Sequence, residues 1–389
     1  QSEEVVTLLA TNGTDALRIA REELPDVVVT DLMMDKMHGY TLIQEIRNDP
    51  TLSHVKILVT SAKTYSSDVE RTKRLGADRY LSKPYDLQNF WNTISELLQE
   101  KLSPFTVRFW GTRGSIATPG PATTKYGGNT SCTEVRCGDQ LLILDAGTGI
   151  RVLGQSLLNE FKQRPIKGHI FIGHTHWDHI QGFPFFAPAY NPSNEFSIHS
   201  LHGAEKPLHK IFRGQMDSDY FPVLLSEMRA NLKFCELNGE LKLGETEVTY
   251  MFLNHPGLAV GFRISFAGRS LVYLSDHETY GRLTPGPVSP DPMDVEVARF
   301  AEGADLLISE AQYTEEEYPL KKGWGHSTFL DVLERAEMAK VKRLAIFHHD
   351  PSHDDEFMDG VLDFCHKTIA ERNYNFTCCL AQEGSTIEI

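Results

Sequence analysis

The first part of the chain alternates between short apolar, β-branched runs and longer stretches whose apolar positions recur at helical spacing. The short runs, which we expect to form strands, are residues 5–10, 26–30, 55–59 and 80–81. The helical stretches are residues 14–24, 40–47, 69–75 and 87–98. Strands that alternate with helices in this way predict a parallel sheet covered by helices.

A short polar segment, residues 100–104, follows the last of these helical stretches. Pro104 disfavours helical backbone at the residue before it, so the helix is expected to end here. We therefore predict one domain over residues 1–103 and a second over residues 104–389. The joint is too short for a loose tether, so each domain should influence the orientation of the other.

In the second domain, apolar runs repeatedly end in an ionisable residue. The first run alternates apolar and polar residues from Phe105 to Phe109, as a half-buried strand does. The ionisable residues that follow the later runs are Asp145, His174, His255, Asp276, Glu310 and His348. Layered α/β proteins assemble their sites from polar residues at the carboxyl ends of strands, so these side chains are expected to converge.

Composition and charge narrow the range of functions. With 389 residues, 41% of them hydrophobic and 23% charged, the chain has a globular composition and the length of two domains. Residues 1–103 carry 12 basic and 16 acidic residues, and the remainder carries 26 and 37. Neither part has the basic excess of a nucleic-acid-binding protein, so a nucleic-acid partner is not expected.

The sequence also bears on location. No apolar run approaches the length of about 18 residues that a membrane-spanning helix needs. Residues 1–11 contain no basic region followed by a long apolar core, so an export signal is not expected in this segment. The six cysteines include no C-x-x-C pair, as in proteins of a reducing compartment. We therefore expect a cytoplasmic protein with no membrane partner.

The densest group of possible ligands is the segment His174-Thr175-His176-Trp177-Asp178-His179. Four potential metal ligands in six residues cannot all lie on one face of a regular helix or strand. A loop just after a strand can direct two of them one way and two another. Imidazoles together with a carboxylate suit Zn²⁺, Fe or Mn²⁺, so the segment predicts a metal site.

This H-x-H-x-D-H segment resembles that of the metallo-β-lactamase superfamily, and the resemblance extends over residues 105–389. It implies a four-layer αββα sandwich with two divalent metal ions at one edge, with zinc favoured and manganese or iron as alternatives. The resemblance assigns the first metal to His174, His176 and His255. It assigns the second metal to Asp178, His179 and His348, with Asp276 bridging the two.

Three neighbouring residues need separate interpretation. Asp145 is expected either to orient a metal ligand or to be a plain turn residue before Gly147. His348 directly follows its apolar run and is therefore preferred over His349, which is left as an orienting residue or a substrate contact. His353 is expected on the surface.

Two further segments, Leu307-Ile308-Ser309-Glu310-Ala311 and Gly325-His326-Ser327-Thr328, resemble those of tRNA 3′-processing endonucleases (RNase Z) and their phosphodiesterase relatives. In that family the histidine donates a proton to the leaving oxygen and the glutamate steadies it. A nearby carboxylate favours the imidazolium form that such a donor needs. We accordingly expect His326, Glu310 and Asp178 to be catalytic. The alternative is that Glu310 ends a strand and His326 caps a helix.

These features favour a dinuclear-metal phosphodiesterase that acts on a small phosphodiester such as a cyclic nucleotide or dinucleotide. RNase Z enzymes carry a basic, Gly-rich arm that grips tRNA, whereas residues 180–250 here are acidic and aromatic in part. The alternatives are an RNA 3′-endonuclease of the RNase Z type, a thioester or lactone hydrolase, and a catalytically silent signalling scaffold. Arg113 is a candidate phosphate contact or an ordinary surface arginine.

The first domain resembles a two-component receiver. Asp31 matches the phospho-acceptor, Thr60 the hydroxyl that senses the phosphoryl group, Tyr80 the aromatic switch residue and Lys83 the lysine of the site. The resemblance implies a flavodoxin-like α/β fold whose first strand is missing from this sequence. Residues 5–10, the neighbours of that strand, are therefore expected to be poorly ordered.

The missing strand carries the acidic pair that binds Mg²⁺ in receivers, so Mg²⁺ is expected at Asp31 only if that pair exists upstream of Gln1. Otherwise the domain would be a remnant. The receiver resemblance also implies its partners. A sensor histidine kinase would phosphorylate the domain, and a second copy of the chain would form a homodimer.

Overall fold

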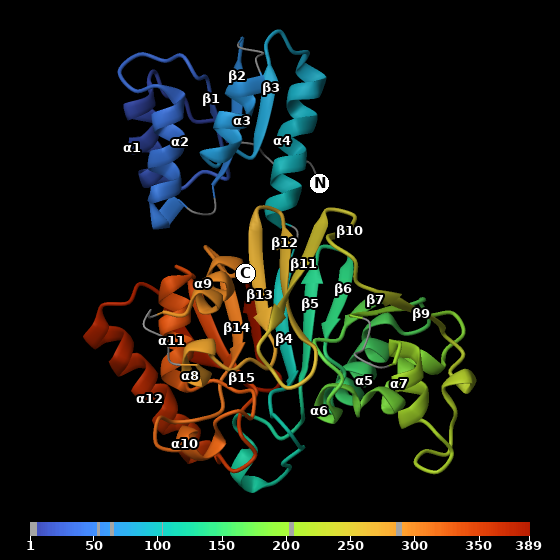
Figure 1. Ribbon diagram of the computed structural model, residues 1–389. Coiled ribbons are helices and arrows are strands. Elements are labelled where there is room, and N and C mark those ends of the chain that lie inside the picture. The colour runs from blue at the N-terminus through green and yellow to red at the C-terminus, as the bar shows by residue number, and fades with distance from the viewer. Residues whose placement is uncertain (1–5, 53–54, 63–65, 103, 202–205, 285–289) are drawn as a thin grey trace. The chain divides into compact units, whose positions relative to one another are not determined.

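The computed structural model describes residues 6–52, 55–62, 66–102, 104–201, 206–284 and 290–389. The chain divides into two compact units, Gln1–Pro104 and Phe105–Ile389 (Figure 1). Among the described residues, none of the helices combines the length and the apolar character that crossing a bilayer requires.

The N-terminal unit contains a parallel sheet with helices on both faces. Its strands lie in the order β1 (Val27–Thr30), β2 (Lys56–Ser61) and β3 (Arg79–Ser82). Its helices are α1 (Gly13–Glu23), α2 (Gly39–Asn48), α3 (Ser66–Arg74) and α4 (Leu87–Leu102). Side chains alternate across β2, so Ile57 and Val59 pack against α1 and α2 while Leu58 packs against α4.

The described sheet of this unit has three strands, where a complete receiver has five. Residues 6–10, the described part of the strand expected over 5–10, form no strand. Val6 and Leu9 are 81% and 86% exposed, so these apolar side chains have no sheet to pack on. The other three predicted strands and the flanking helices are present, and the α/β receiver fold is confirmed.

The C-terminal unit contains two seven-stranded sheets. The first has the order β17-β4-β5-β6-β7-β8-β9 and the second the order β10-β11-β12-β13-β14-β15-β16. The strands of the first sheet are β4 (Phe105–Gly111), β5 (Cys132–Cys137), β6 (Gln140–Leu144), β7 (Lys167–Phe171), β8 (Glu195–Ser200), β9 (Asn231–Glu236) and β17 (Thr386–Glu388). The strands of the second are β10 (Leu241–Leu243), β11 (Thr246–Leu253), β12 (Ala259–Phe266), β13 (Arg269–Leu274), β14 (Leu306–Glu310), β15 (Arg343–Phe347) and β16 (Thr377–Leu380).

Helices cover the outer face of each sheet (Figure 1). The α-helices of this unit are α5 (Gly149–Phe161), α6 (Trp177–Ile180), α7 (Leu208–Gln215), α8 (Tyr280–Leu283), α9 (Pro292–Phe300), α10 (Tyr318–Lys321), α11 (Phe329–Met338) and α12 (Asp355–Arg372). The short 3₁₀ helices of the chain are η1 (Pro50–Leu52), η2 (Pro121–Thr123), η3 (Phe183–Phe185), η4 (Ala187–Tyr190) and η5 (Leu225–Glu227).

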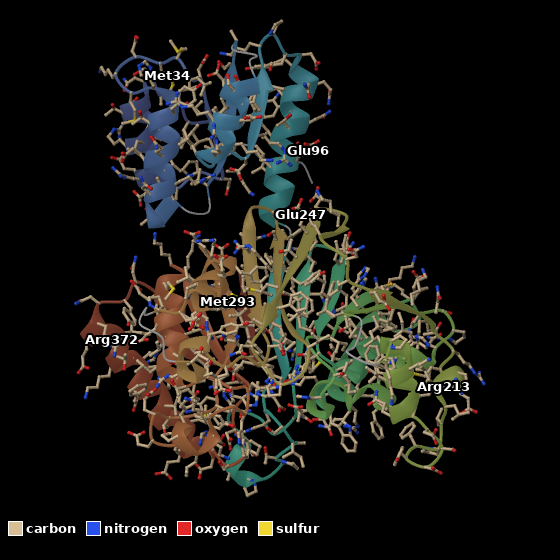
Figure 2. All side chains as sticks on the ribbon, viewed as in Figure 1. Met34, Glu96, Arg213, Glu247, Met293 and Arg372 are labelled. Carbon is tan, nitrogen blue, oxygen red and sulfur yellow. The ribbon has the colours of Figure 1, made fainter. Side chains whose placement is uncertain are left out.

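The apolar core lies in three layers. Between the sheets, Phe105, Val107 and Phe109 of β4 pack with Phe262 and Phe347 of the opposite sheet, as the alternation along β4 predicts. Separate apolar clusters join α5 and α7 to the first sheet, and α9, α11 and α12 to the second. Charged side chains such as Arg213 and Arg372 are exposed on the outer helices (Figure 2). The four-layer αββα sandwich expected from the sequence is confirmed.

Strand direction brings the predicted ionisable residues to one edge of the sandwich. β6 and β7 are parallel neighbours, as are β13, β14 and β15. β11 is antiparallel to β12, which is antiparallel to β13, so β11 and β13 run the same way. The residues that follow the carboxyl ends of these strands therefore meet across the gap between the sheets.

Candidate metal centre

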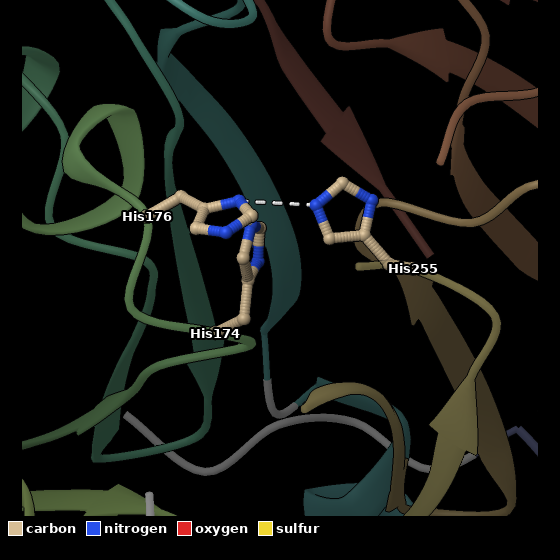
Figure 3. Close-up of side chains that lie close together, drawn as sticks. All are labelled: His174, His176 and His255. Atoms are coloured by element: carbon tan, nitrogen blue, oxygen red, sulfur yellow. Dashed lines mark hydrogen bonds between the residues drawn. The ribbon is translucent and has the colours of Figure 1, made fainter. Parts of the chain in front are cut away.

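Three histidines from two sheets converge on one point, and we call them the histidine cluster: His174, His176 and His255 (Figure 3). The His176 Nδ1 atom lies 3.1 Å from His174 Nε2 and 3.0 Å from His255 Nε2. His255 donates its Nδ1–H to the carbonyl of Gly325 at 2.8 Å, which leaves its Nε2 lone pair directed at the cluster. Burial lowers the pKa of His255 to about 4, so the ring is neutral.

A second group, which we call the mixed cluster, consists of Asp178, His179 and His348. The His348 Nε2 atom lies 3.0 Å from Asp178 Oδ2 and 3.2 Å from His179 Nε2. His179 Nε2 lies 3.3 Å from Asp178 Oδ2. Burial alone would lower the pKa of His179, but the carboxylates of Asp178, Asp276 and Asp145 raise it well above the ordinary value. The three carboxylates thus favour a cation at this point, either a proton on the ring or a metal ion beside it.

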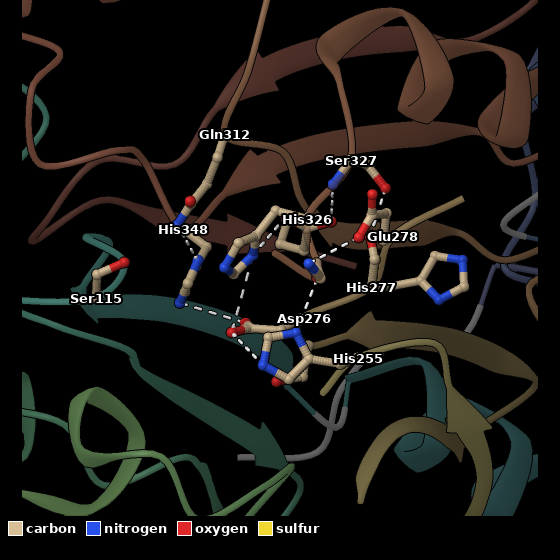
Figure 4. Close-up of polar contacts among 12 residues, drawn as sticks. Ser115, His255, Asp276, His277, Glu278, Gln312, His326, Ser327 and His348 are labelled. Carbon is tan, nitrogen blue, oxygen red and sulfur yellow. Dashed lines mark hydrogen bonds and ion pairs between the residues drawn. The ribbon is translucent and has the colours of Figure 1, made fainter. Parts of the chain in front are cut away.

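Asp276 lies between the two clusters and offers one oxygen to each (Figure 4). Oδ2 is 3.4 Å from His174 Nε2 and 3.7 Å from His255 Nε2. Oδ1 is 3.4 Å from His179 Nε2 and 3.3 Å from His348 Nε2. The side chain is buried, and its Oδ1 has no hydrogen-bond partner. A buried carboxylate oxygen without a partner is costly unless a cation satisfies it.

These distances fit metal ions. In a tetrahedral site with bonds of about 2.0–2.1 Å, neighbouring ligand atoms lie about 3.3–3.4 Å apart. Six pairs of these ligand atoms lie 3.0–3.7 Å apart, and within each cluster all of the ligand atoms lie within 4.8 Å of one another. Imidazole nitrogens and carboxylate oxygens are donors that Zn²⁺, Mn²⁺ and iron all accept. The seven residues expected as ligands thus lie together, in two groups that could each hold one ion.

Asp145 orients His179. Its Oδ2 lies 2.8 Å from His179 Nδ1 and accepts the hydroxyl of Tyr273 at 2.6 Å, and its Oδ1 accepts the N–H of Gly173 at 2.8 Å. A carboxylate on the outer nitrogen of a ligating imidazole fixes the tautomer and directs the other nitrogen inward. This is the arrangement of an orienting residue and not of a plain turn residue. Tyr273 lies inside an apolar run, so no local pattern marked it as part of the site.

His348 and Asp178 are held by residues that follow β14 and β4, respectively. The carboxamide of Gln312 lies 2.8 Å from His348 Nδ1, and the N–H of Ser115 donates to Asp178 Oδ2 at 2.8 Å. A Cβ on Gly114 would lie 2.3 Å from the Gln312 amide and 2.5 Å from the His348 ring, so only glycine fits there. Ser115 and His348, like Asp145, have left-handed backbone with φ of 61–63°. Such strain costs about 1–3 kcal/mol per residue and is typical of functional sites.

His326 lies beside His255, Asp276 and His348 (Figure 4), and Glu310 lies close to His326 and His348. His326 Nδ1 is 3.4 Å from Glu310 Oε2 and 3.9 Å from Asp276 Oδ2, and both residues are buried. The N–H of Ser327 donates to the other oxygen of Glu310 at 2.9 Å. Burial alone would lower the pKa of His326, but Glu310 and Asp276 raise it above its ordinary value. The pair therefore favours an imidazolium next to the two clusters.

A buried glutamate that the sequence did not single out, Glu278, joins these parts. Its Oε2 accepts the N–H of Gly325 at 2.8 Å, while its Oε1 accepts the N–H of Gly323 at 2.8 Å and the hydroxyl of Tyr318 at 2.6 Å. The backbone of Glu278 exchanges hydrogen bonds with Asn254, the residue before His255. Glu278 thus holds residues 323–326 in place. This segment contains both the Gly325 carbonyl that binds His255 and the side chain of His326.

Three expectations about nearby residues are wrong. Arg113 is fully buried and donates to the carbonyls of Gly127, Asp350 and His353, so it is neither a phosphate contact nor a surface arginine. His353 is buried too, with its Nε2 2.8 Å from Glu317. His349 is buried and donates to the carbonyl of Ala381, and burial lowers its pKa to about 3. The segment around Arg113 is thus hydrogen-bonded to residues 350–353, a contact that the sequence pattern did not indicate.

In the N-terminal unit, the structure brings the expected phospho-acceptor and lysine together. Lys83 Nζ lies 2.7 Å from Asp31 Oδ2. Thr30 pairs with Val59 across β1 and β2, so Asp31 and Thr60 follow on adjacent strands. Burial alone would raise the pKa of Asp31, but Lys83 lowers it below the ordinary value. Tyr80 is partly buried at the neighbouring strand β3.

Comparison with known families agrees with this architecture. Residues 141–349 match the beta-lactamase superfamily domain, and residues 1–95 match the response regulator receiver domain. The protein PilH of Pseudomonas aeruginosa is 34% identical over 91 residues, which make up 23% of this chain and 75% of PilH.

Two solved structures share the fold. The metallo-beta-lactamase fold protein YhfI from Bacillus subtilis is 19% identical with a TM-score of 0.52, and the match covers 74% of this chain and 100% of YhfI. A diphosphatase from the PhnP family is 17% identical with a TM-score of 0.50, and the match covers 73% of this chain and 98% of that protein. At identities of 19% and 17%, the likeness shows a shared fold and nothing beyond it.

Proposed function

Because the chain belongs to the beta-lactamase superfamily through residues 141–349 and carries a response regulator receiver domain over residues 1–95, we propose that it is a receiver-regulated, metal-dependent phosphodiesterase. The observation that carries the choice of reaction is the buried pair of His326 and Glu310 beside Asp276. Cleavage of a phosphodiester expels an alkoxide, which needs a proton as it leaves. A lactone or thioester hydrolase has less need of a dedicated donor.

The proposed cofactor is a pair of divalent ions, zinc first and manganese or iron as alternatives. His174, His176 and His255 would hold one, Asp178, His179 and His348 the other, and Asp276 both. When bound, two such ions stabilise negative charge on phosphoryl oxygens and lower the pKa of a coordinated water. Asp145 keeps the tautomer of His179, and Glu310 keeps His326 protonated, so that both rings are in the required state before substrate arrives.

A small substrate is favoured over RNA. The second part of the chain carries 26 basic and 37 acidic residues, so its charge repels a polyanion that approaches from a distance. One protein that shares the fold is a diphosphatase, which supports phosphorus chemistry on this scaffold. The proposed substrate is therefore a small phosphodiester such as a cyclic nucleotide or cyclic dinucleotide.

A substrate panel tests this proposal. The metal-loaded protein is assayed for kcat/KM on cyclic nucleotides, cyclic dinucleotides, a precursor tRNA and lactones, each at several salt concentrations. We expect a cyclic phosphodiester to be the best substrate, with weak dependence on salt because few phosphate contacts are made. Efficient cleavage of the precursor tRNA with a steep salt dependence would instead establish an endonuclease. A preferred lactone would exclude the proposed reaction.

We further propose that a sensor histidine kinase phosphorylates Asp31 and that this modification alters activity or oligomeric state. The contact of Asp31 with Lys83, and the position of Thr60 on the adjacent strand, support Asp31 as the acceptor. In the natural full-length gene product, the phosphoryl mimic beryllofluoride with Mg²⁺ should change kcat/KM about five-fold or more, the lower range of allosteric coupling.

Asp31→Ala should abolish this response while leaving unstimulated activity unchanged. The matched control is Asp35→Ala, which removes an exposed carboxylate close to Asp31 in the sequence and should respond as the natural protein does. Sedimentation velocity measured alongside reports any change between monomer and dimer. A response to beryllofluoride that survives in Asp31→Ala would show that the acceptor lies elsewhere.

A further inference from the structure

The histidine cluster is open to solvent on one side. His176 is exposed, whereas the side chains of His174 and His255 are buried. A substrate must approach this cluster past His176. Side chains next to His176 will therefore contact those parts of the substrate that lie beyond its phosphoryl group.

Two exposed tryptophans adjoin, along the chain, residues of this cluster or the residue that holds it. Trp177 directly follows His176 and is 79% exposed, and Trp324 directly precedes Gly325, whose carbonyl holds His255, and is 57% exposed. The remaining tryptophan of this unit, Trp110, is buried and donates its indole N–H to Glu134 at 2.8 Å. Both exposed indoles of the unit thus belong to chain neighbours of His176, a member of the cluster, or of Gly325, which holds His255.

The backbone that carries each indole is held in place. Trp177 begins α6, and its carbonyl accepts the N–H of Gln181 at 2.7 Å. Trp324 lies between Gly323 and Gly325, and both of these residues donate their N–H groups to Glu278 at 2.8 Å. Rigid presentation of an exposed aromatic ring lowers the entropy that is lost when the ring binds a ligand.

We propose that Trp177 and Trp324 form a stacking subsite for a planar nucleobase of the substrate. This inference rests on the proposed phosphodiesterase function. Lys321 Nζ lies 4.3 Å from the centre of the Trp324 ring and covers one face, so a base would stack on the other. This unit is acidic overall, so long-range attraction of phosphate contributes little to affinity. Stacking of a base on an aromatic ring contributes affinity that the negative net charge does not weaken.

Equilibrium binding of reaction-product analogues tests the subsite. Calorimetry on the metal-loaded full chain compares ribose 5-phosphate with the monophosphates of adenosine, guanosine, cytidine and uridine, which add only a base. We expect at least one nucleotide to bind 5-fold or more tighter than ribose 5-phosphate, within the range of about 5- to 150-fold that one stacked base provides. Trp177→Ala and Trp324→Ala should each reduce this preference and leave ribose 5-phosphate binding unchanged.

Matched variants separate stacking from a loss of structure. Trp177→Phe keeps an aromatic ring and should retain part of the preference, and Phe364→Ala removes a 43% exposed ring on α12 and should retain all of it. Equal binding of all five ligands, or a base preference that survives both alanine variants, would overturn the subsite. If the base preference depends on the tryptophans but the protein hydrolyses no phosphodiester, the proposed function fails and the subsite stands.

Discussion

Replacing Asp276 with asparagine is expected to remove metal from both clusters at once and to lower turnover by about 10³-fold or more. One oxygen of Asp276 faces each cluster, and the Oδ1 atom has no other partner. An amide keeps the shape but loses the charge that holds the ions. Metal ions contribute several kcal/mol to such reactions, and about 1.4 kcal/mol corresponds to a factor of ten in rate. Elemental analysis and kcat measure the two losses.

The control is Asp305→Asn. Asp305 accepts the backbone N–H of Ser270 at 2.7 Å, and it precedes β14, so it lies at the opposite end of that strand from Glu310. This variant should keep its full metal content and its turnover. If Asp276→Asn retained two metal ions per chain, Asp276 would not be a bridging ligand and the proposed dinuclear centre would have to be abandoned.

Replacing His326 with alanine is expected to leave the metal content unchanged and to lower kcat by about 10²–10⁴-fold, the usual contribution of general acid catalysis. The loss should apply to substrates with an alkoxide leaving group. It should shrink strongly for a nitrophenyl phosphodiester, because a nitrophenolate leaves without a proton. The ratio of the two losses, measured under the same conditions, reports proton donation and is insensitive to a general loss of active protein.

Glu310→Gln tests the same proton by its pH dependence. Glu310 helps to raise the pKa of His326, so the acid form persists to higher pH in the natural protein and activity is lost as the pH rises through that pKa. Without the carboxylate the pKa of His326 falls, and the alkaline limb of the kcat profile should move to lower pH. His353→Ala is the control, since His353 pairs with Glu317 outside the clusters. An alkaline limb that does not move in Glu310→Gln would exclude this role for Glu310.

The sequence predicted those site residues that terminate apolar runs. Asp145, Asp276, Glu310 and His348 could be found because each ends a strand or follows one within two residues, and a strand end is a position that pattern alone identifies. The sandwich itself was predicted from the resemblance carried by the H-x-H-x-D-H segment, whereas the alternation along Phe105–Phe109 predicted one half-buried strand.

Residues that act through contacts between distant segments were not predicted. Glu278 binds N–H groups more than forty residues further along the chain, and no local pattern marks such a contact. Gly114 is needed because His348 lies against it, which only the folded structure reveals. The positions of Arg113 and His353 were predicted wrongly for the same reason. A charged or polar side chain is expected to be exposed unless a partner is available in the interior, and here a backbone carbonyl binds Arg113 and the carboxylate of Glu317 binds His353.

The hydrogen bonds of Glu278 make two chemically separate tasks depend on one another. The carboxylate fixes Gly325, whose carbonyl orients the ligand His255, and the next residue along the chain is His326. An ion that binds His255 therefore also stabilises the position of His326, the proposed proton donor. By the same coupling, a correctly positioned His326 strengthens binding of the ion. A chain that has lost the ion at His255 should also hold its proton donor less accurately. Activity should then fall more steeply with declining metal occupancy than the fraction of occupied sites alone would require.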